Sequence, residues 1–133
     1  MKRIILLLLC SFLIPNGTIH FIYNANDDFF STVGDFFHKS FSPKTYNCDL
    51  CQLTYGAFNK KKKWKNFLSS LEYNYTFIYK NQDNDLLNNI HSFPVIILEK
   101  EDKSIILLST TDLEQCKNLD DLINKINKEL NKS

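Results

Sequence analysis

The chain has 133 residues, of which 44% are hydrophobic, 14% are aromatic and 23% are charged, and its net charge is +1. This length predicts a single domain, and this hydrophobic content excludes an intrinsically disordered chain. A near-neutral charge lacks the broad basic surface that nucleic-acid binding requires, so we expect no nucleic-acid partner.

Residues 1–16 predict a secretory signal or a hydrophobic anchor, and hence an N-terminal membrane association. Lys2 and Arg3 precede an apolar run that Pro15 ends, which is the layout of a signal segment. The run is too short to span a bilayer comfortably, and no small-residue cleavage motif follows it. An additional apolar strand and an upstream extension of the true start are the alternatives. A true leader implies an exported or membrane-anchored protein on the periplasmic side, and otherwise the protein is cytoplasmic.

Residues 17–133 form an alternation of strand and helix patterns. The apolar and aromatic segment 18–25 predicts a strand. One of the aspartates that follow it caps a predicted aromatic helix that ends near Phe41, because Pro43 disfavours helical geometry at the residue before it.

The second half of the chain continues the alternation. A helix is indicated by the stripe of Trp64, Phe67, Leu68 and Leu71, after a lysine-rich run that is typical of a solvated helix start. Residues 75–80 predict a strand, and Asp85 to Ile90 predict a short helix. The apolar runs 95–98 and 105–108 flank a charged loop and predict an antiparallel hairpin.

The last helix has the clearest pattern. Asn118 can cap it, and Asp120 and Asp121 lie in its first turn, where the helix dipole favours negative charge. One face carries Leu119, Leu122, Ile123, Ile126 and Leu130. A strand–helix–strand opening implies a right-handed parallel crossover, to which the hairpin adds antiparallel strands. We therefore expect an α/β fold with a mixed sheet and helices on both faces.

The C-terminal part resembles the thioredoxin superfamily in three features: the proline that opens a strand in "SFPVIIL", the hairpin return "SIILLS", and the closing amphipathic helix. The resemblance implies a single thioredoxin-like domain over residues 17–133. In that superfamily the equivalent proline is usually cis and stands beside the redox pair, so the resemblance marks Pro94 as a site residue that shapes a substrate groove.

The middle of the chain is similar to a group of small bacterial proteins. The shared segments are a strand like "FIYNA", the stretch "SPKTYNCDLCQLTYG" with its C-x-L-C-x-L-T-Y-G core, and "WKNFL". Members are sometimes labelled GTPase, but the chain contains no phosphate-loop motif. In thioredoxins the cysteine pair directly follows the first core strand, whereas here it follows the predicted aromatic helix.

Cys48 and Cys51 form a Cys-x-x-Cys pair, which is typical of thiol–disulfide exchange when it opens a helix. In this interpretation Cys48 attacks a protein or small-molecule disulfide and Cys51 resolves the mixed disulfide, with no cofactor. The nearby lysines would favour the thiolate and Asp49 would disfavour it. The hypothesis requires both sulfurs to lie at a reachable surface beside Pro94.

Two alternatives stay open for the pair. A zinc site needs four ligands, and His38 and Cys116 are candidates to complete Cys48 and Cys51, with His91 as a substitute, although no second ligand pair has standard spacing. The cysteines could instead be structural, as buried thiols or a static disulfide in a non-catalytic binding module of the same fold.

Other polar and aromatic residues have weaker signals. His20 is expected to be a half-buried strand residue, and His91 is a candidate for the cleft beside Pro94. Tyr46 and Tyr55 flank the cysteine pair, where ordinary packing explains them. Asn24, Asn26 and Asp27 follow the first strand, where open α/β sheets bind ligands and where helix capping is equally expected.

Overall fold

The structure is a computed structural model that describes residues 15–26, 48–55 and 60–133. The helix predicted to end near Phe41 lies outside these residues. The described elements are, in chain order, β1 (Thr18–Tyr23), α4 (Asp49–Thr54), α5 (Lys62–Ser70), β2 (Asn74–Tyr79), the 3₁₀ helix η2 (Asp85–Asn89), β3 (Val95–Lys100), β4 (Lys103–Leu108), α6 (Thr110–Glu114) and α7 (Leu119–Lys132).

The four strands form one mixed sheet in the order β2-β1-β3-β4. β1 pairs in parallel with β2 and antiparallel with β3, and β3 pairs antiparallel with β4. The predicted α/β mixed sheet is therefore confirmed. β1 lies inside the sheet, so its backbone is bonded on both sides, and five of its six residues are buried.

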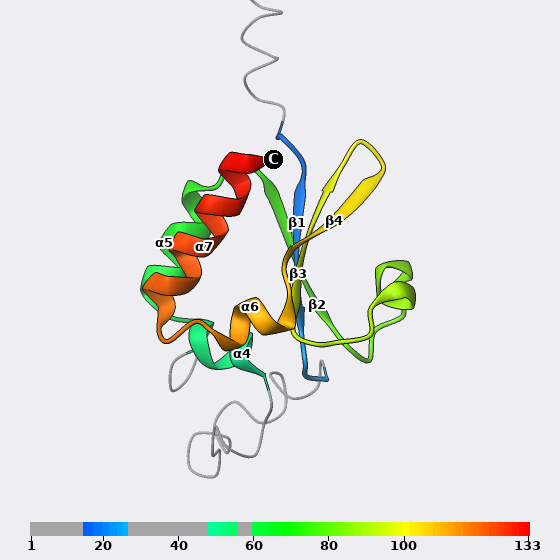
Figure 1. The fold of residues 1–133 in the computed structure, drawn as a ribbon, viewed down its shortest axis with the longest axis horizontal. Coiled ribbons are helices and arrows are strands. Elements are labelled where there is room, and N and C mark those ends of the chain that lie inside the picture. The colour runs from blue at the N-terminus through cyan, green and yellow to red at the C-terminus, as the bar shows by residue number, and fades with distance from the viewer. Residues whose placement is uncertain (1–14, 27–47, 56–59) are drawn as a thin grey trace, which may run out of the picture.

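The sheet separates two hydrophobic clusters. Helices α5 and α7 cover one face (Figure 1), toward which Ile19, Phe21 and Tyr23 of β1 point. On the other face Ile22 packs with residues of β2, β3 and η2. In the part of the chain that the structure describes, α-helices cover one face and a 3₁₀ helix covers part of the other.

Trp64 anchors α5 to the sheet. Its ring is completely buried and meets Phe21 edge-on at 5.2 Å between centroids, and Phe67 stacks against it at 5.4 Å. Burying a side chain of this size stabilises the fold by roughly 1.5–3 kcal/mol. The apolar stripe of the sequence thus packs onto the central strand.

The hairpin is longer and its loop is shorter than the apolar runs predict. Only Glu101 and Asp102 connect the strands, and both have a positive φ, of 47° and 66°. Such a two-residue turn follows the twist of the flanking strands. Charged residues of the predicted loop therefore extend β3 and β4 into solvent.

Helix α6 is absent from the sequence-based expectation. It begins with a capping box, in which Ser109 and Asp112 exchange side-chain and backbone hydrogen bonds. Thr110 also donates a hydrogen bond to the Pro94 carbonyl at 2.8 Å. The helix is too short to have an apolar repeat, so only its capping residues could have revealed it.

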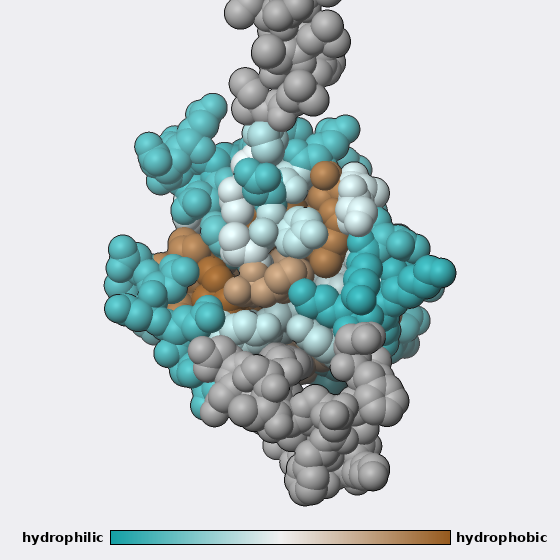
Figure 2. Space-filling model, turned by 180° about the vertical axis from the view of Figure 1, so that it is seen from behind, coloured by the Kyte–Doolittle hydropathy of each residue, from teal (hydrophilic) through white to brown (hydrophobic). Residues whose placement is uncertain are grey.

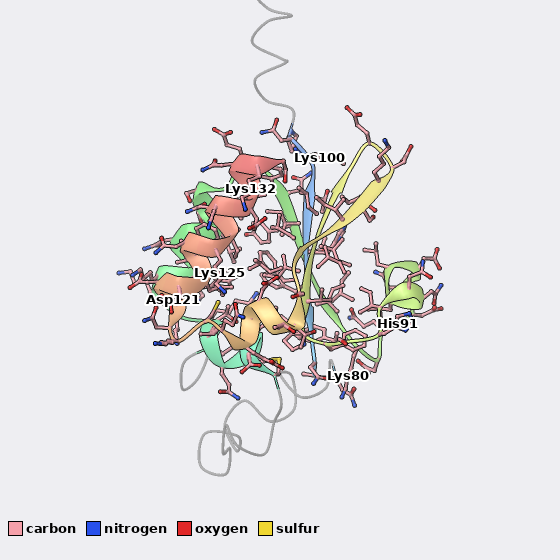
Figure 3. All side chains as sticks on the ribbon, in the orientation of Figure 1. Lys80, His91, Lys100, Asp121, Lys125 and Lys132 are labelled. Atoms are coloured by element: carbon pink, nitrogen blue, oxygen red, sulfur yellow. A yellow bond between two sulfur atoms is a disulfide. The ribbon has the colours of Figure 1, made fainter. Side chains whose placement is uncertain are left out.

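The outer surfaces of the helices are polar. On α7, Lys132 is 61% exposed and pairs with Glu129, whereas the Lys125 ammonium donates to the Asp112 carbonyl at 3.1 Å (Figure 3). Figure 2 shows the opposite side of the molecule, where hydrophobic patches near the middle are flanked by hydrophilic residues. Among the described residues, no helix has both the length and the apolar character needed to cross a membrane.

The N-cap of α7 provides a test of the fold. Asn118 accepts a hydrogen bond from the Asp121 backbone N–H at 2.9 Å. We expect Asn118→Ala to lower the free energy of unfolding by about 1 kcal/mol, because one N–H loses its partner. Asn118→Asp retains an acceptor and should stay close to wild type. Urea unfolding measures both, and equal losses in the two variants would contradict the capping role.

Candidate functional site

Cys48 and Cys51 are joined in a disulfide at the start of α4. Their Cα atoms are 5.3 Å apart, within the usual range for a disulfide. Cys48 is the N-cap of the helix, and its sulfur accepts a hydrogen bond from the Cys51 backbone N–H at 3.3 Å. The pair therefore opens a helix, which is the condition that the redox interpretation sets.

Local sequence explains why this short helix forms. The Cys48 carbonyl accepts from the Gln52 N–H and the Cys51 carbonyl accepts from the Tyr55 N–H. Thr54 cannot reach solvent, so its hydroxyl donates to the Leu50 carbonyl at 2.7 Å. Asp49 lies in the first turn, where the helix dipole favours its charge.

The two cysteines are buried. Cys48 has no exposed surface and Cys51 is 5% exposed, and both belong to the main hydrophobic cluster. A thiolate must reach a sulfur along the S–S axis to exchange with it. The surface access that the redox hypothesis requires is therefore not met in this disulfide form, and exchange needs a local opening around α4.

Pro94 and the cysteine pair lie at the same end of the sheet. The Phe93–Pro94 bond is cis, and Pro94 directly precedes β3, whose first residue, Val95, pairs with Ile22 near the end of β1. Helix α6 contacts α4, and its Thr110 is bonded to Pro94. Figure 1 shows α4 and α6 together at this end. The displaced position of the pair in the sequence thus does not move it to the opposite end.

Three tyrosines adjoin α4 at the ends of β1 and β2. Tyr23 stacks with Tyr79 at 5.6 Å and meets Tyr55 edge-on at 6.0 Å between ring centroids. Burial raises the pKa of Tyr23 well above its ordinary value. Burial also raises the pKa of Tyr55. Tyr55 is thus part of this packing, as expected, and Tyr46 lies outside the described residues.

The lysines after α4 have different partners. Lys61 reaches the Gln52 carbonyl of α4 at 3.5 Å, whereas Lys63 forms an ion pair with Asp120 of α7. The Lys60 ammonium lies 3.1 Å from the centroid of the Phe77 ring. Only part of the basic run therefore lies near the cysteine pair.

Cys116 is a free thiol between α6 and α7. Its sulfur donates to the Asp112 carbonyl at 3.6 Å, and burial raises its pKa. Of the alternative zinc ligands, His38 lies outside the described residues. Within the described ranges, no three His, Cys, Asp or Glu side chains gather in a way that could hold a metal ion.

His91 lies on the η2 side of the molecule (Figure 3). It lines a cavity of about 280 Å³ together with Val95 and Thr110. Thr110 donates to the Pro94 carbonyl, so His91 shares this pocket with a residue that contacts the proline, and its role in a cleft beside Pro94 stays a prediction. Of the residues after β1, Asn24 and Asn26 are described and Asp27 is not.

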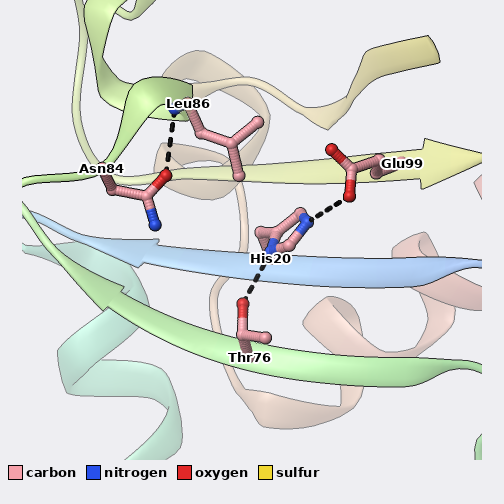
Figure 4. A network of polar contacts seen from close by, with 5 residues as sticks. All are labelled: His20, Thr76, Asn84, Leu86 and Glu99. Atoms are coloured by element: carbon pink, nitrogen blue, oxygen red, sulfur yellow. Dashed lines mark hydrogen bonds and ion pairs between the residues drawn. The ribbon is translucent and has the colours of Figure 1, made fainter. Parts of the chain in front are cut away.

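Sequence reasoning missed a polar site on the η2 face of the sheet (Figure 4). His20 is 7% exposed in β1, with Nδ1 2.6 Å from the Thr76 hydroxyl and Nε2 3.4 Å from a Glu99 carboxylate oxygen. Asn84 caps η2 by accepting from the Leu86 N–H. The histidine in an apolar strand was the only sequence signal for this network.

In comparisons with known proteins, the chain matched no protein-family model, no curated protein and no solved structure.

The disulfide should contribute to stability. Closing a loop of four residues lowers the entropy of the unfolded chain, which corresponds to about 2 kcal/mol. We expect the Cys48→Ser, Cys51→Ser double variant to have a free energy of unfolding that is lower by this amount, as measured by urea unfolding. Cys116→Ser is the matched control and should unfold like the wild type under oxidising conditions. A double variant as stable as the wild type would contradict this contribution.

Lys60 predicts how stability depends on pH. Burial, with a smaller effect of Lys65, lowers the pKa of Lys60 from 10.5 to about 8, while the Phe77 ring opposes this by favouring the charged form. Between these pH values the unfolded chain binds more protons, so stability rises with pH from about 8. It falls again above 10, where unfolded tyrosines ionise before Tyr23 and Tyr55 do.

Urea unfolding at a series of pH values tests this dependence. We expect Lys60→Met to abolish the rise above pH 8 and to leave the decline above pH 10. Lys62→Met, at the exposed start of α5, is the matched control and should keep the rise. The same rise in Lys60→Met as in the wild type would exclude Lys60 as its cause.

Proposed function

We propose that this protein is a thioredoxin-like domain whose Cys48–Cys51 disulfide is redox-responsive and exchanges with thiols. The observation that carries the proposal is the position of the pair: bonded, at the start of a helix, and at the same end of the sheet as the cis-proline Pro94. This is the combination that the sequence resemblance implies for a thiol–disulfide oxidoreductase.

The thioredoxin-like assignment rests on three features of the fold. The sheet combines a parallel β1–β2 pair with the antiparallel β3–β4 hairpin, a cis-proline opens β3, and the amphipathic helix α7 closes the chain. The distance in sequence between β1 and Cys48 departs from the superfamily pattern, but the pair and Pro94 still share one end of the sheet.

The exchange reaction has two steps. A thiolate attacks one of the two sulfurs, the Cys48–Cys51 bond breaks, and the other cysteine leaves as a thiolate. A second thiolate then attacks the mixed disulfide, which yields the protein dithiol and an oxidised small molecule or protein. In the disulfide form the Cys48 sulfur accepts a hydrogen bond from the Cys51 N–H. In the reduced protein the same N–H would stabilise a Cys48 thiolate.

Burial determines the kind of redox function. Because neither sulfur is reachable in the disulfide form, exchange requires local opening of α4, a six-residue helix. We therefore favour a protein that responds slowly to the redox poise of its compartment over an enzyme with rapid turnover. The same burial favours the second candidate function, a non-catalytic module in which the disulfide only braces the chain after Cys48.

Thiol counting in glutathione buffers distinguishes the two functions. For a redox-responsive pair we expect Cys48 and Cys51 to interconvert reversibly between dithiol and disulfide within the range of cellular glutathione potentials, while Cys116→Ser behaves like the wild type. Slow reaction of the folded protein, accelerated by low urea, would demonstrate that opening limits the rate.

Two other outcomes would contradict the proposal. A pair that stays oxidised in every buffer until the protein unfolds would reject redox responsiveness and leave the structural module. Catalytic reduction of insulin disulfides that is lost in Cys48→Ser would show an enzyme with rapid turnover, which the buried geometry disfavours.

A further inference from the structure

The free side of β4 differs from an ordinary polar strand edge. Within the described ranges β4 pairs only with β3, so its other side ends the sheet. Ile105 and Ile106 are 51% and 63% exposed there, and with Tyr75 they are the large exposed hydrophobic residues of the described chain. Two adjacent exposed isoleucines on an unpaired strand are unfavourable in water unless something covers them.

Their neighbours in the register show which faces they occupy. Ile106 pairs with Ile97, on the η2 face, whereas Ile105 pairs with Leu98, on the face covered by α5 and α7. Successive strand residues point to opposite faces. A ligand that covers both must therefore extend along the edge, as an added strand does.

The η2 face beside this edge is hollowed and acidic. A groove of about 590 Å³ runs between η2 and the hairpin, with Ile90, Ile97 and Ile106 among its apolar walls. Asp85 and Glu99 also line it, and no described lysine or arginine does. Glu99 keeps 42% of its side chain exposed while it contacts the buried His20 (Figure 4).

We propose that the β4 edge binds an extended peptide segment of another protein, in which a basic residue is followed along the strand by two aliphatic residues. The peptide pairs with Ser104, Ile105 and Ile106 as a fifth strand. Its basic side chain lies on the η2 face toward Glu99, and the two aliphatic side chains cover Ile105 and Ile106. Such strand addition takes affinity from the backbone and specificity from alternate side chains.

The geometry of a sheet permits the charge contact. Ser104 pairs with Glu99, so a peptide residue beside Ser104 lies two strands from Glu99, roughly 10 Å at the usual strand spacing. An extended Lys or Arg side chain can approach a carboxylate over that distance. The small Ser104 side chain leaves the path between them open.

A second copy of this chain is a poorer occupant. If two β4 strands paired antiparallel about a twofold axis perpendicular to the sheet, the groove face of the added strand would carry Ser104 and Ile106, neither of which is basic. Lys103 pairs with Lys100 and lies on the opposite face from Glu99. The acidic groove would then stay without a partner.

Fluorescence anisotropy with a labelled peptide Thr-Arg-Ile-Val-Thr tests the proposal, with the reversed sequence included because a strand can add in either direction. We expect one of the two to bind the full chain, and the same peptide with Glu in place of Arg to bind at least tenfold more weakly. Glu99→Lys should reverse this preference, and Ile106→Asp should weaken binding about tenfold or more.

The control variant is Tyr75→Thr, which alters an exposed ring on β2, the other edge of the sheet. It should bind like the wild type. Asp85→Asn serves as a second charge variant that leaves the Glu99–His20 contact in place, and circular dichroism verifies that each variant is folded. Asp85→Asn should narrow the difference in affinity between the Arg and Glu peptides.

Several results would overturn the proposal. These are the absence of binding by both peptides, equal binding of Arg and Glu peptides, or an equal loss in Tyr75→Thr and Ile106→Asp. A dimer seen by analytical ultracentrifugation and broken by Ile106→Asp would replace the peptide with a second copy. Binding of hexylamine that depends on Glu99, without peptide binding, would assign the groove to a small cationic amphiphile.

Discussion

The structure depends on the burial of β1 between two strands and two hydrophobic clusters. Ile19, Phe21 and Ile22 have no exposed surface, and Tyr23 is equally buried at the end of the strand. The parallel pairing with β2 and the antiparallel pairing with β3 therefore bring the carboxyl end of β1 next to the start of β3. This arrangement places the cysteine pair near Pro94 and places His20 beside Thr76 and Glu99.

At that end of the sheet, the packing of the cysteine pair opposes the redox chemistry that we propose for it. Cys48 and Cys51 are buried and pack as apolar groups in the hydrophobic cluster. The same burial keeps external thiols away from their sulfurs. The tyrosines beside α4 add further apolar surface. A disulfide in such surroundings is available only to the extent that the short helix opens, so its function depends on local stability as much as on its own chemistry.

A second polar site lies on the opposite face of the sheet, where His20 links β1 to β2 and β3. Its partners are 56 and 79 residues away in the sequence, and they satisfy a polar ring in an apolar strand. One of them, Glu99, also lines the groove beside β4. The groove and the disulfide lie on different elements, so exchange at one and binding at the other can be tested separately.

The elements that sequence reasoning predicted are those with a local cause. β1 follows from an apolar run, α5 and α7 from stripes at helical spacing, and the hairpin from two apolar segments around a charged one. Helix α6 was missed because five residues carry no period, although Ser109 and Asp112 have the spacing of a capping box. The predicted loop of the hairpin was too long because charged residues can extend a strand into solvent.

By itself, the sequence determined the mixed α/β class, the cysteine pair and the proline that opens β3, since each is written in neighbouring residues. Only the tertiary structure decided that Cys48 is buried, that α4 and Pro94 share one end of the sheet, and that Glu99 meets His20 beside an exposed edge. Burial and proximity arise from contacts between residues far apart in the chain, which no local pattern encodes.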